Sequence, residues 1–223
     1  MKTVTIVIPT YNEEDNILKI QKQLKRLEGN FDVIFTDGYS ADKTYEKISY
    51  PKIQKTKHRA NQMNIAAEEI NSDYIWFVHA DSIISKKSIN AILNSKARYG
   101  CFSLHFIPTN LRFKNFLMKL VGISSNLRVI FRHITFGDQG IFIQTKLFKE
   151  IGGYSPIPIM EDYDLSIRLK KLGIYPKLLK TKIYTSPRRF YKNGIIKTII
   201  KMQRLQHLFR NGKDINYIYE QYK

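Results

Sequence analysis

Short β-type runs alternate with helix-type segments along this chain, and this alternation constrains the fold more than any other feature. Residues 4–8 form a β-branched run closed by Pro9, and residues 16–27 then carry apolar side chains at helical spacing. Further strands are predicted at 32–36, 74–78, 100–107, 140–143 and 178–184. Further helices are predicted at 42–48, 59–70, 86–94, 146–151 and 162–172. Such alternation predicts an α/β fold with a Rossmann-like, mostly parallel central sheet flanked by helices.

Two segments of the second half behave differently. Residues 109–135 mix basic, aromatic and aliphatic side chains without one clear period, so no element is predicted there. Residues 194–210 place apolar side chains at helical spacing among basic ones, which predicts a C-terminal amphipathic, cationic helix. The chain has 223 residues, 43% of them hydrophobic, and we expect one domain over 1–223.

The sequence carries no signal for membrane insertion or export. Its apolar stretches fall far short of the roughly 18 residues that a membrane span needs. The N-terminus lacks the long apolar region and the cleavage site of a secretory signal. Cys101 is the single cysteine, so no internal disulfide is expected. We therefore expect a cytoplasmic protein.

The charge balance points to anionic partners without choosing among them. Lysine and arginine number 37 against 19 aspartate and glutamate residues, which gives a net charge of +18. Such a charge raises the local concentration of nucleotides, nucleic acid or anionic lipid. General residue bias explains the charge equally well, so it decides little by itself.

In open parallel sheets, ligands bind beyond the carboxyl ends of the strands, and polar residues follow several of the predicted strands. After the first strand, Pro9, Thr10, Tyr11 and Glu13 lead into a helix whose backbone amides attract anions, and the Tyr11 ring suits a base. Asp37 follows the second strand and could accept a hydrogen bond from a base. Taken alone, each segment is better explained as a helix cap or an Asp-Gly turn.

Carboxylates at two later positions suit catalysis. Asp81 leaves a buried strand, where it could bind a divalent cation that bridges two phosphates; capping the next helix is its alternative role. Glu161, Asp162 and Asp164 crowd the start of a predicted helix, and their mutual repulsion favours uptake of a proton or a cation. One of them could act as a general base, although acidic residues there also complement the helix dipole.

Together these segments resemble the family 2 glycosyltransferases of the GT-A fold, over residues 4 to about 222. IVIPTYNEEDNI resembles the family's nucleotide-binding loop, FTDGYSADKT its base-binding segment, and IMEDYDLSIRL its ED motif. FVHADS occupies the place of the DXD metal motif, with His79 replacing the first aspartate. The resemblance implies Asp162 as the base with Glu161 beside it. It also implies a Mn²⁺ or Mg²⁺ ion held by Asp81, with His79 as a further candidate ligand.

More narrowly, HRANQMNIAA, FVHADS, TFGDQGIF and TSPRRF resemble a subgroup of soluble bacterial glycosyltransferases associated with radical-SAM, selenium or arsenosugar genes. This resemblance implies Arg59 and Gln62 beside the nucleotide and Asp138 and Gln139 near the acceptor. It also implies Arg188 and Arg189 near the diphosphate, as a pair that could neutralise the leaving group.

The family resemblance implies transfer of a sugar from a nucleoside-diphosphate sugar, with UDP the expected nucleotide, to an unidentified hydroxyl of a small-molecule or lipid-linked acceptor. A single base without a covalent nucleophile implies inversion at the anomeric carbon. The expected organisation is a nucleotide-sugar half (1–107), an acceptor and catalytic half (108–190) and a helical extension (191–223).

Three alternatives remain open at this level. A sugar-phosphate nucleotidyltransferase would share the sheet and the phosphate chemistry, but no GxGxxR-like loop follows the first strand. A nucleic-acid-binding protein would use the +18 charge and the aromatic residues, but no recognised binding motif supports it. Finally, residues 111–132 and 194–210 could place a catalytic protein peripherally on an anionic membrane.

Overall fold

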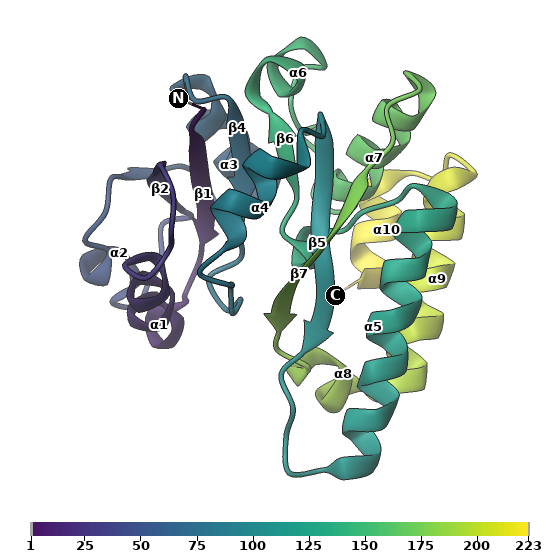
Figure 1. Cartoon of the computed structure of the whole chain (residues 1–223). Helices are drawn as coiled ribbons and strands as arrows, with labels where there is room; N and C mark the ends of the chain where they lie inside the picture. The colour runs from purple at the N-terminus through teal and green to yellow at the C-terminus, as the bar shows by residue number, and fades with distance from the viewer. Residues whose placement is uncertain (1, 223) are drawn as a thin grey trace.

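A seven-stranded sheet runs through the computed structural model, which describes residues 2–222 (Figure 1). Its strands are β1 (Val4–Thr10), β2 (Phe31–Asp37), β3 (Lys52–Gln54), β4 (Tyr74–Phe77), β5 (Tyr99–Phe106), β6 (Phe142–Gln144) and β7 (Lys177–Thr185). Their spatial order is β3-β2-β1-β4-β6-β5-β7, and within this sheet β6 alone pairs antiparallel with its neighbours. The predicted mostly parallel sheet is thus confirmed.

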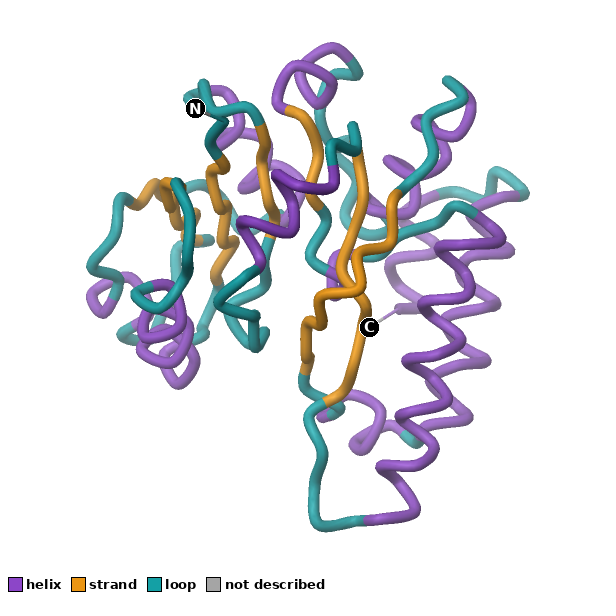
Figure 2. Tube along the Cα trace, in the orientation of Figure 1, coloured by secondary structure: helices purple, strands orange, loops and turns teal. Residues whose placement is uncertain are grey.

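Helices surround the sheet, as the tube in Figure 2 shows. They are α1 (Glu14–Leu24), α2 (Thr44–Lys47), α3 (Arg59–Glu68), α4 (Ser88–Ser95), α5 (Arg112–Arg132), the 3-10 turn η1 (Gly137–Gln139), α6 (Thr145–Glu150), α7 (Glu161–Lys171), α8 (Arg188–Asn193), α9 (Ile195–Arg210) and α10 (Ile215–Tyr222). The segment for which the sequence predicted no element forms the long helix α5, and the predicted cationic helix forms as α9.

The sheet is buried on both faces. Along β1, Ile6 and Ile8 belong to one apolar cluster, whereas Val7 between them belongs to the cluster on the opposite face. This explains the continuous β-branched run of the sequence, since a central parallel strand is covered on both sides. Trp76 of β4 packs against Phe102 of β5 with ring centroids 5.0 Å apart, which joins the two halves of the sheet.

A third cluster joins the C-terminal helices to the rest of the molecule. Tyr163 of α7, Leu205 of α9 and Ile218 of α10 are buried together. The Tyr163 ring meets Phe209 edge to face at 5.8 Å. Helices α9 and α10 are therefore packed against α7, the helix that carries the predicted catalytic carboxylates.

The topology brings the candidate loops to one edge of the sheet. Strands β1, β2 and β4 are mutually parallel, and β5 and β7 run in the same direction because β6 is antiparallel to both β4 and β5. Their carboxyl ends consequently share an edge, where Thr10, Asp37 and Thr185 end three of the strands.

Within residues 2–222, none of the helices combines the length and the apolar character that crossing a bilayer requires.

Candidate active site

The loops after β1 and β2 are fastened to each other by buried polar side chains. Asp37 is fully buried and accepts hydrogen bonds from the Ser40 backbone N–H at 2.9 Å and from Thr10 Oγ1 at 3.2 Å. Gln62 of α3 donates from Nε2 to the carbonyl oxygens of Thr10 at 3.0 Å and Thr36 at 2.8 Å. Asp37 and Gln62 therefore hold the ends of β1 and β2 in place, beneath the surface of the predicted nucleotide site.

The half-buried ring of Tyr11 lies in the loop after β1, beside these hydrogen bonds. Lys57 Nζ sits 3.6 Å from the centroid of the half-buried Tyr11 ring, in cation–π contact, and Pro9 is also half-buried. Asn12 and Tyr39 have left-handed backbones, with φ of 52° and 58°. Such conformations cost about 1 kcal/mol or more in non-glycine residues and cluster at functional sites. The loops are thus held in an unfavourable shape beside the ring that the sequence predicted to hold a base.

Arg188 links the C-terminal part of the chain to Asp81 and Glu13. Its Nη2 lies 3.6 Å from Glu13 Oε1 and 3.9 Å from Asp81 Oδ2, and its side chain is 67% exposed. Residues predicted to meet the metal, the nucleotide and the diphosphate therefore meet in the fold, although they come from β1, β4 and β7 ends far apart in sequence. An exposed arginine there is free to engage phosphate instead of carboxylate.

Asp162 lies close to His79, and the charge of Arg59 acts on both side chains. Its Oδ2 accepts from the Gly137 backbone N–H and its Oδ1 from that of Tyr163, both at 2.7 Å. A side-chain carbon built on Gly137 would lie 2.9 Å from His79 Nε2 and 3.6 Å from Asp162 Oδ2. Only glycine fits between them without displacing His79, so the two predicted site residues approach one another through the bare backbone of η1.

Burial and charge set the protonation of this pair. Burial, followed by the neighbouring Glu161 carboxylate, raises the pKa of Asp162 to about 7, against the Gly137 hydrogen bond and Arg59, which lower it. Burial and the Arg59 charge lower the pKa of His79 to about 3. At neutral pH the His79 imidazole is therefore neutral, and Asp162 is poised between its acid and its base form.

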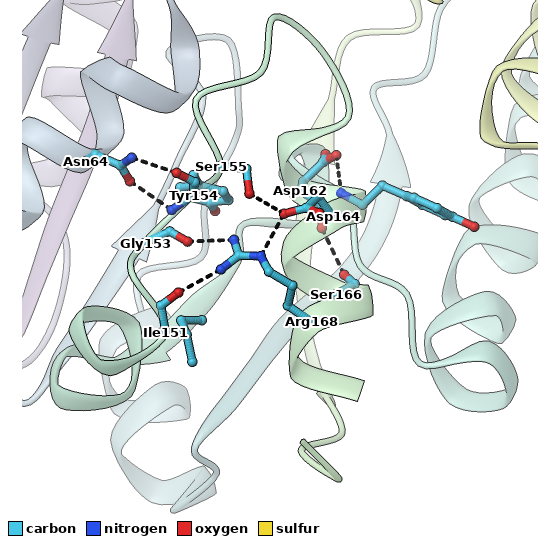
Figure 3. Close-up of polar contacts among 10 residues, drawn as sticks. Asn64, Ile151, Gly153, Tyr154, Ser155, Asp162, Asp164, Ser166 and Arg168 are labelled. Carbon is cyan, nitrogen blue, oxygen red and sulfur yellow. Dashed lines mark hydrogen bonds and ion pairs between the residues drawn. The ribbon is translucent and has the colours of Figure 1, made fainter. Parts of the chain in front are cut away.

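Asp164 is occupied by structural contacts. Arg168 donates to its carboxylate at 2.7 Å and also to the carbonyl oxygens of Ile151 at 2.8 Å and Gly153 at 2.6 Å (Figure 3). Ser155 donates to the same Asp164 oxygen at 2.6 Å. These bonds lock the first turns of α7 to the preceding loop. Asp162, in contrast, lies beside Gly137 and His79.

A small buried network of hydroxyl groups positions the backbone of Asp162. Ser166 donates to the Asp162 carbonyl at 3.0 Å, and its hydroxyl also bonds Tyr99 and Thr135, each at 3.0 Å. Met160, immediately before α7, has a left-handed backbone with φ of 68°. The helix that presents Asp162 is thus positioned by its own hydroxyl network rather than by a side-chain cap.

The two residues predicted for the acceptor side differ in their surroundings. Asp138 Oδ1 is buried without a hydrogen-bond partner among the described residues, and burial raises the pKa of this carboxyl. Gln139 is fully buried, and its Oε1 accepts from Arg128 at 3.0 Å and from the Phe136 backbone at 3.3 Å. The structure therefore places Gln139 in the interior, whereas Asp138 keeps an oxygen available.

The remaining predicted arginines have partners of their own. Arg59 Nη1 lies 3.3 Å from Glu161 Oε1, which places it at the carboxylates of α7. Arg189 donates to the Tyr222 hydroxyl at 2.7 Å and lies 4.3 Å over the Tyr222 ring. The fold thus directs Arg188 to Asp81 and Glu13, whereas Arg189 is bound to α10.

Arg128 is the charged residue of this region that the sequence did not single out. It lies 4.1 Å over the Phe136 ring and, together with its bond to Gln139, holds the segment that precedes Gly137. Its position in α5, outside every recognisable motif, left no signal by which to find it.

The carboxylates at the sheet edge suit a cation shared with substrate. Within residues 2–222, no group of three histidine, cysteine, aspartate or glutamate side chains is arranged to hold a metal. Asp81 and the unpartnered oxygen of Asp138 provide hard carboxylate donors, and the neutral imidazole of His79 is a softer nitrogen donor. Mg²⁺ and similar ions in phosphate sites take only one or two protein ligands, so these residues fit such an ion.

The sheet order, the single antiparallel strand and the site at the carboxyl edge define an α/β protein of the GT-A fold. The chain belongs to a family with that fold: the family model of glycosyl transferase family 2 matches residues 5–152. No curated protein sequence matches the chain significantly.

Solved structures share this fold at low sequence identity. One is a mannosyltransferase, PcManGT from Pyrobaculum calidifontis, in complex with GDP-Man and Mn²⁺, with a TM-score of 0.64 and 16% identity. Another is TarS 1–349 from S. aureus, with a TM-score of 0.60 and 18% identity. The chain is covered to 95% and 93% but spans only 64% and 66% of these structures. A further TarS structure contains UDP-GlcNAc, with a TM-score of 0.58 and 16% identity over 83% of this chain and 58% of that one.

Proposed function

We propose that this chain is an inverting glycosyltransferase that moves a sugar from a nucleoside-diphosphate sugar to an acceptor hydroxyl, with Asp162 as the general base. The observation that carries the proposal is the environment of Asp162. Its half-buried carboxylate is oriented by two backbone N–H groups and has a pKa raised to about 7, to which the adjacent Glu161 carboxylate contributes. A base with this pKa accepts a proton efficiently at neutral pH.

In the proposed reaction, the acceptor oxygen attacks the anomeric carbon while its proton passes to Asp162. The bond from that carbon to the diphosphate breaks, and the nucleoside diphosphate leaves with the bonding electrons. Attack opposite the leaving group inverts the configuration at the anomeric carbon. Because no enzyme nucleophile is assigned, only one displacement takes place and the product keeps the inverted configuration. In this proposal Asp138, whose Oδ1 has no hydrogen-bond partner among the described residues, lines the acceptor side of Asp162. Gly137, which carries no side chain, lies between His79 and Asp162.

The proposed diphosphate site combines Arg188 with Asp81. Arg188 is mostly exposed and its contacts with Glu13 and Asp81 are long ion pairs, so phosphate can replace the carboxylates as its partner. A Mn²⁺ or Mg²⁺ ion held by Asp81, with His79 nearby, would supply positive charge to the departing diphosphate. The Mn²⁺ and GDP-Man in the mannosyltransferase of the same fold support this assignment.

The nucleotide is proposed to lie against Tyr11 at the ends of β1 and β2. Pro9 and Tyr11 offer half-buried apolar surface there, while Asp37 and Gln62 fix the loops beneath it. UDP is the nucleotide that we propose, as in the TarS complex with UDP-GlcNAc. The four segments that resemble the radical-SAM, selenium or arsenosugar subgroup make a small polar molecule a reasonable first acceptor to test.

The decisive experiment is an assay of the purified chain with a panel of nucleotide sugars, with and without Mn²⁺. We expect one donor to be consumed with release of nucleoside diphosphate, and proton NMR of the first-formed product to report the inverted anomer. Asp162→Asn should reduce turnover by about 100-fold or more, as expected for loss of a general base. Asp164→Asn is the matched control, since that neighbour is engaged by Arg168 and Ser155.

Two results would contradict the proposal. Retention of the anomeric configuration would require a covalent nucleophile that the mechanism lacks. Release of inorganic pyrophosphate from a nucleoside triphosphate and a sugar phosphate would instead identify a nucleotidyltransferase.

A further inference from the structure

Helix α5 has two unlike faces. Its inward residues are Met118, Gly122, Ser125 and Val129, which pack on β5 and β7. Gly122 makes the approach close: a side-chain carbon built there would lie 3.1 Å from the Leu104 carbonyl oxygen. Gly122 and Ser125 in the middle of the inward face are small, which allows the helix to lie close to the sheet there.

The opposite face of α5 carries an apolar stripe open to solvent. The outer stripe consists of Phe113, Phe116, Leu120, Ile123, Leu127, Ile130 and Phe131. At about 100° per residue these positions gather on the side opposite the inward face. All are exposed, with Phe113 at 73% and Phe131 at 74%. Figure 1 shows α5 along the outer side of β5 and β7, away from β1 and β2. A continuous exposed apolar stripe of this kind marks an interaction surface.

The charge around the outer stripe is of one sign. The exposed residues Arg112, Lys114, Lys119 and Arg132 lie on the same helix. The sequence contains no aspartate or glutamate between Asp81 and Asp138, a stretch that includes β5 and α5. It contains none between Asp164 and Asp214 either, a stretch that includes β7, α8 and α9. The whole layer that carries the stripe is therefore cationic.

We propose that the outer stripe of α5 is a docking surface for an anionic lipid bilayer. An amphipathic helix with aromatic and aliphatic side chains framed by lysine and arginine inserts its apolar face at the headgroup boundary. Each basic residue near the surface adds attraction to anionic headgroups. A second copy of the chain fits the stripe less well, because it would bring two acid-free cationic layers together.

The docked face would be connected to the proposed diphosphate site. Asn115 Oδ1 accepts a hydrogen bond from the Tyr191 hydroxyl of α8 at 3.4 Å, and Lys114 lies 5.2 Å from the centroid of the same ring. Helix α8 begins at Arg188, which reaches Asp81. The first turn of α5 is therefore connected to the diphosphate site through one short helix. A bilayer on α5 would present its headgroups next to the opening.

The test is flotation of the full chain with vesicles of phosphatidylcholine and phosphatidylglycerol, against vesicles of phosphatidylcholine alone. We expect the chain to float with the anionic vesicles and to lose most of this binding on neutral ones. The variant Phe116→Ser with Ile123→Ser should weaken binding at least about tenfold, since two exposed apolar side chains no longer insert. The variant Leu18→Ser with Leu172→Ser removes equally exposed apolar residues outside α5 and should leave binding unchanged.

A second pair of changes separates the two contributions. Arg112→Gln with Lys119→Gln should weaken binding to the anionic vesicles by about tenfold and make the remaining binding less sensitive to salt. Unchanged flotation of the Phe116 and Ile123 variant would overturn the proposal, because adsorption would then be electrostatic alone. Light scattering that shows a dimer lost in this variant, without vesicle binding, would assign the stripe to a second copy. Flotation needs no sugar transfer, so its outcome is independent of the proposed activity.

Discussion

Asp162 differs from the other acidic residues of the candidate site because the preceding residue, Glu161, is also acidic. Glu161 is buried and, after burial itself, is the largest influence that raises the Asp162 pKa to about 7. We expect kcat/KM to rise with pH up to about 7 and then level off. Glu161→Gln removes the neighbouring charge, so the ionised form of Asp162 becomes easier to form and the rise should move about one pH unit lower. The pH profile of kcat/KM measures this shift.

The pH profile of kcat/KM for a second variant serves as the control. Asp164→Asn removes a carboxylate two residues away that is bound by Arg168 and Ser155, and the rise in kcat/KM should stay at the pH of the unaltered protein. A rise that stays in place in Glu161→Gln, or moves to higher pH, would show that Asp162 is not the titrating base.

The raised pKa also predicts how stability depends on pH. The folded pKa of Asp162 lies above its unfolded value of about 4, so the folded protein favours the protonated carboxyl. Stability from this group is present below pH 4 and is lost as the pH rises through 7. Asp162→Asn cannot ionise, and its free energy of unfolding relative to the unaltered protein should therefore increase between pH 4.5 and pH 8, by about 1 kcal/mol or more.

Urea unfolding of both proteins at the two pH values measures this difference. The hydrogen bonds from Gly137 and Tyr163 are perturbed in the variant at either pH, so their loss cancels from the comparison. An equal offset at pH 4.5 and pH 8 would mean that the Asp162 carboxyl titrates normally in the folded state.

At the scale of elements, the short helix α8 separates two adjacent arginines into different roles. Arg188 reaches Asp81 and Glu13, whereas Arg189 is held by Tyr222 of α10. Arg188→Ala should raise the donor KM at least about tenfold with little change in thermal stability, because an exposed charge–charge contact is weak. Arg189→Ala should lower stability by about 1 to 2 kcal/mol, since it loses a hydrogen bond and a cation–π contact.

The two variants control for each other in the same helix. Steady-state kinetics with varied donor and thermal unfolding distinguish them. If Arg189→Ala impaired donor binding as much as Arg188→Ala while leaving stability intact, the assignment of Arg189 to α10 would be incorrect.

The elements that the sequence did not predict have physical reasons in common. The inward face of α5 carries Gly122 and Ser125, whereas its large apolar residues face outward, so the hydrophobic period did not indicate a buried side. Strand β3 is three residues long and joins the sheet through its backbone beside β2. Strong periodicity of hydrophobic residues predicted the buried elements. An element that pairs through its backbone, such as β3, or turns its apolar face outward, such as α5, shows no such periodicity.

For the site, sequence motifs predicted which residues gather but not how each one is used. Arg188 contacts Asp81, and Asp162 lies close to His79. The side-chain amides of Gln62 and Gln139, in contrast, form hydrogen bonds inside the protein. Which polar side chains are consumed by backbone groups depends on the packed structure, and residue type and spacing do not encode it.

At the scale of the whole molecule, the candidate site is assembled from both halves of the chain. Glu13 and Asp81 come from the ends of β1 and β4, whereas Asp162 and Arg188 come from α7 and α8. Ion pairs between the two halves include Arg188 with Asp81 and Glu13, and Arg59 with Glu161, and both arginines are largely exposed. Surface ion pairs contribute little, so a bound ligand would join the two halves more strongly than these contacts do.

A nucleotide sugar together with Mn²⁺ should therefore stabilise the protein more than the two effects added separately. A ligand at about 100 times its Kd contributes about 2.7 kcal/mol, which corresponds to roughly 5 to 10 °C in Tm for a chain of this size. Asp81→Asn should keep the shift from nucleotide sugar alone but lose the additional shift from the metal. Differential scanning fluorimetry across the four ligand conditions measures both. A full metal-dependent shift in Asp81→Asn would place the cation elsewhere, because the edge of β4 would then contribute no charge to its binding.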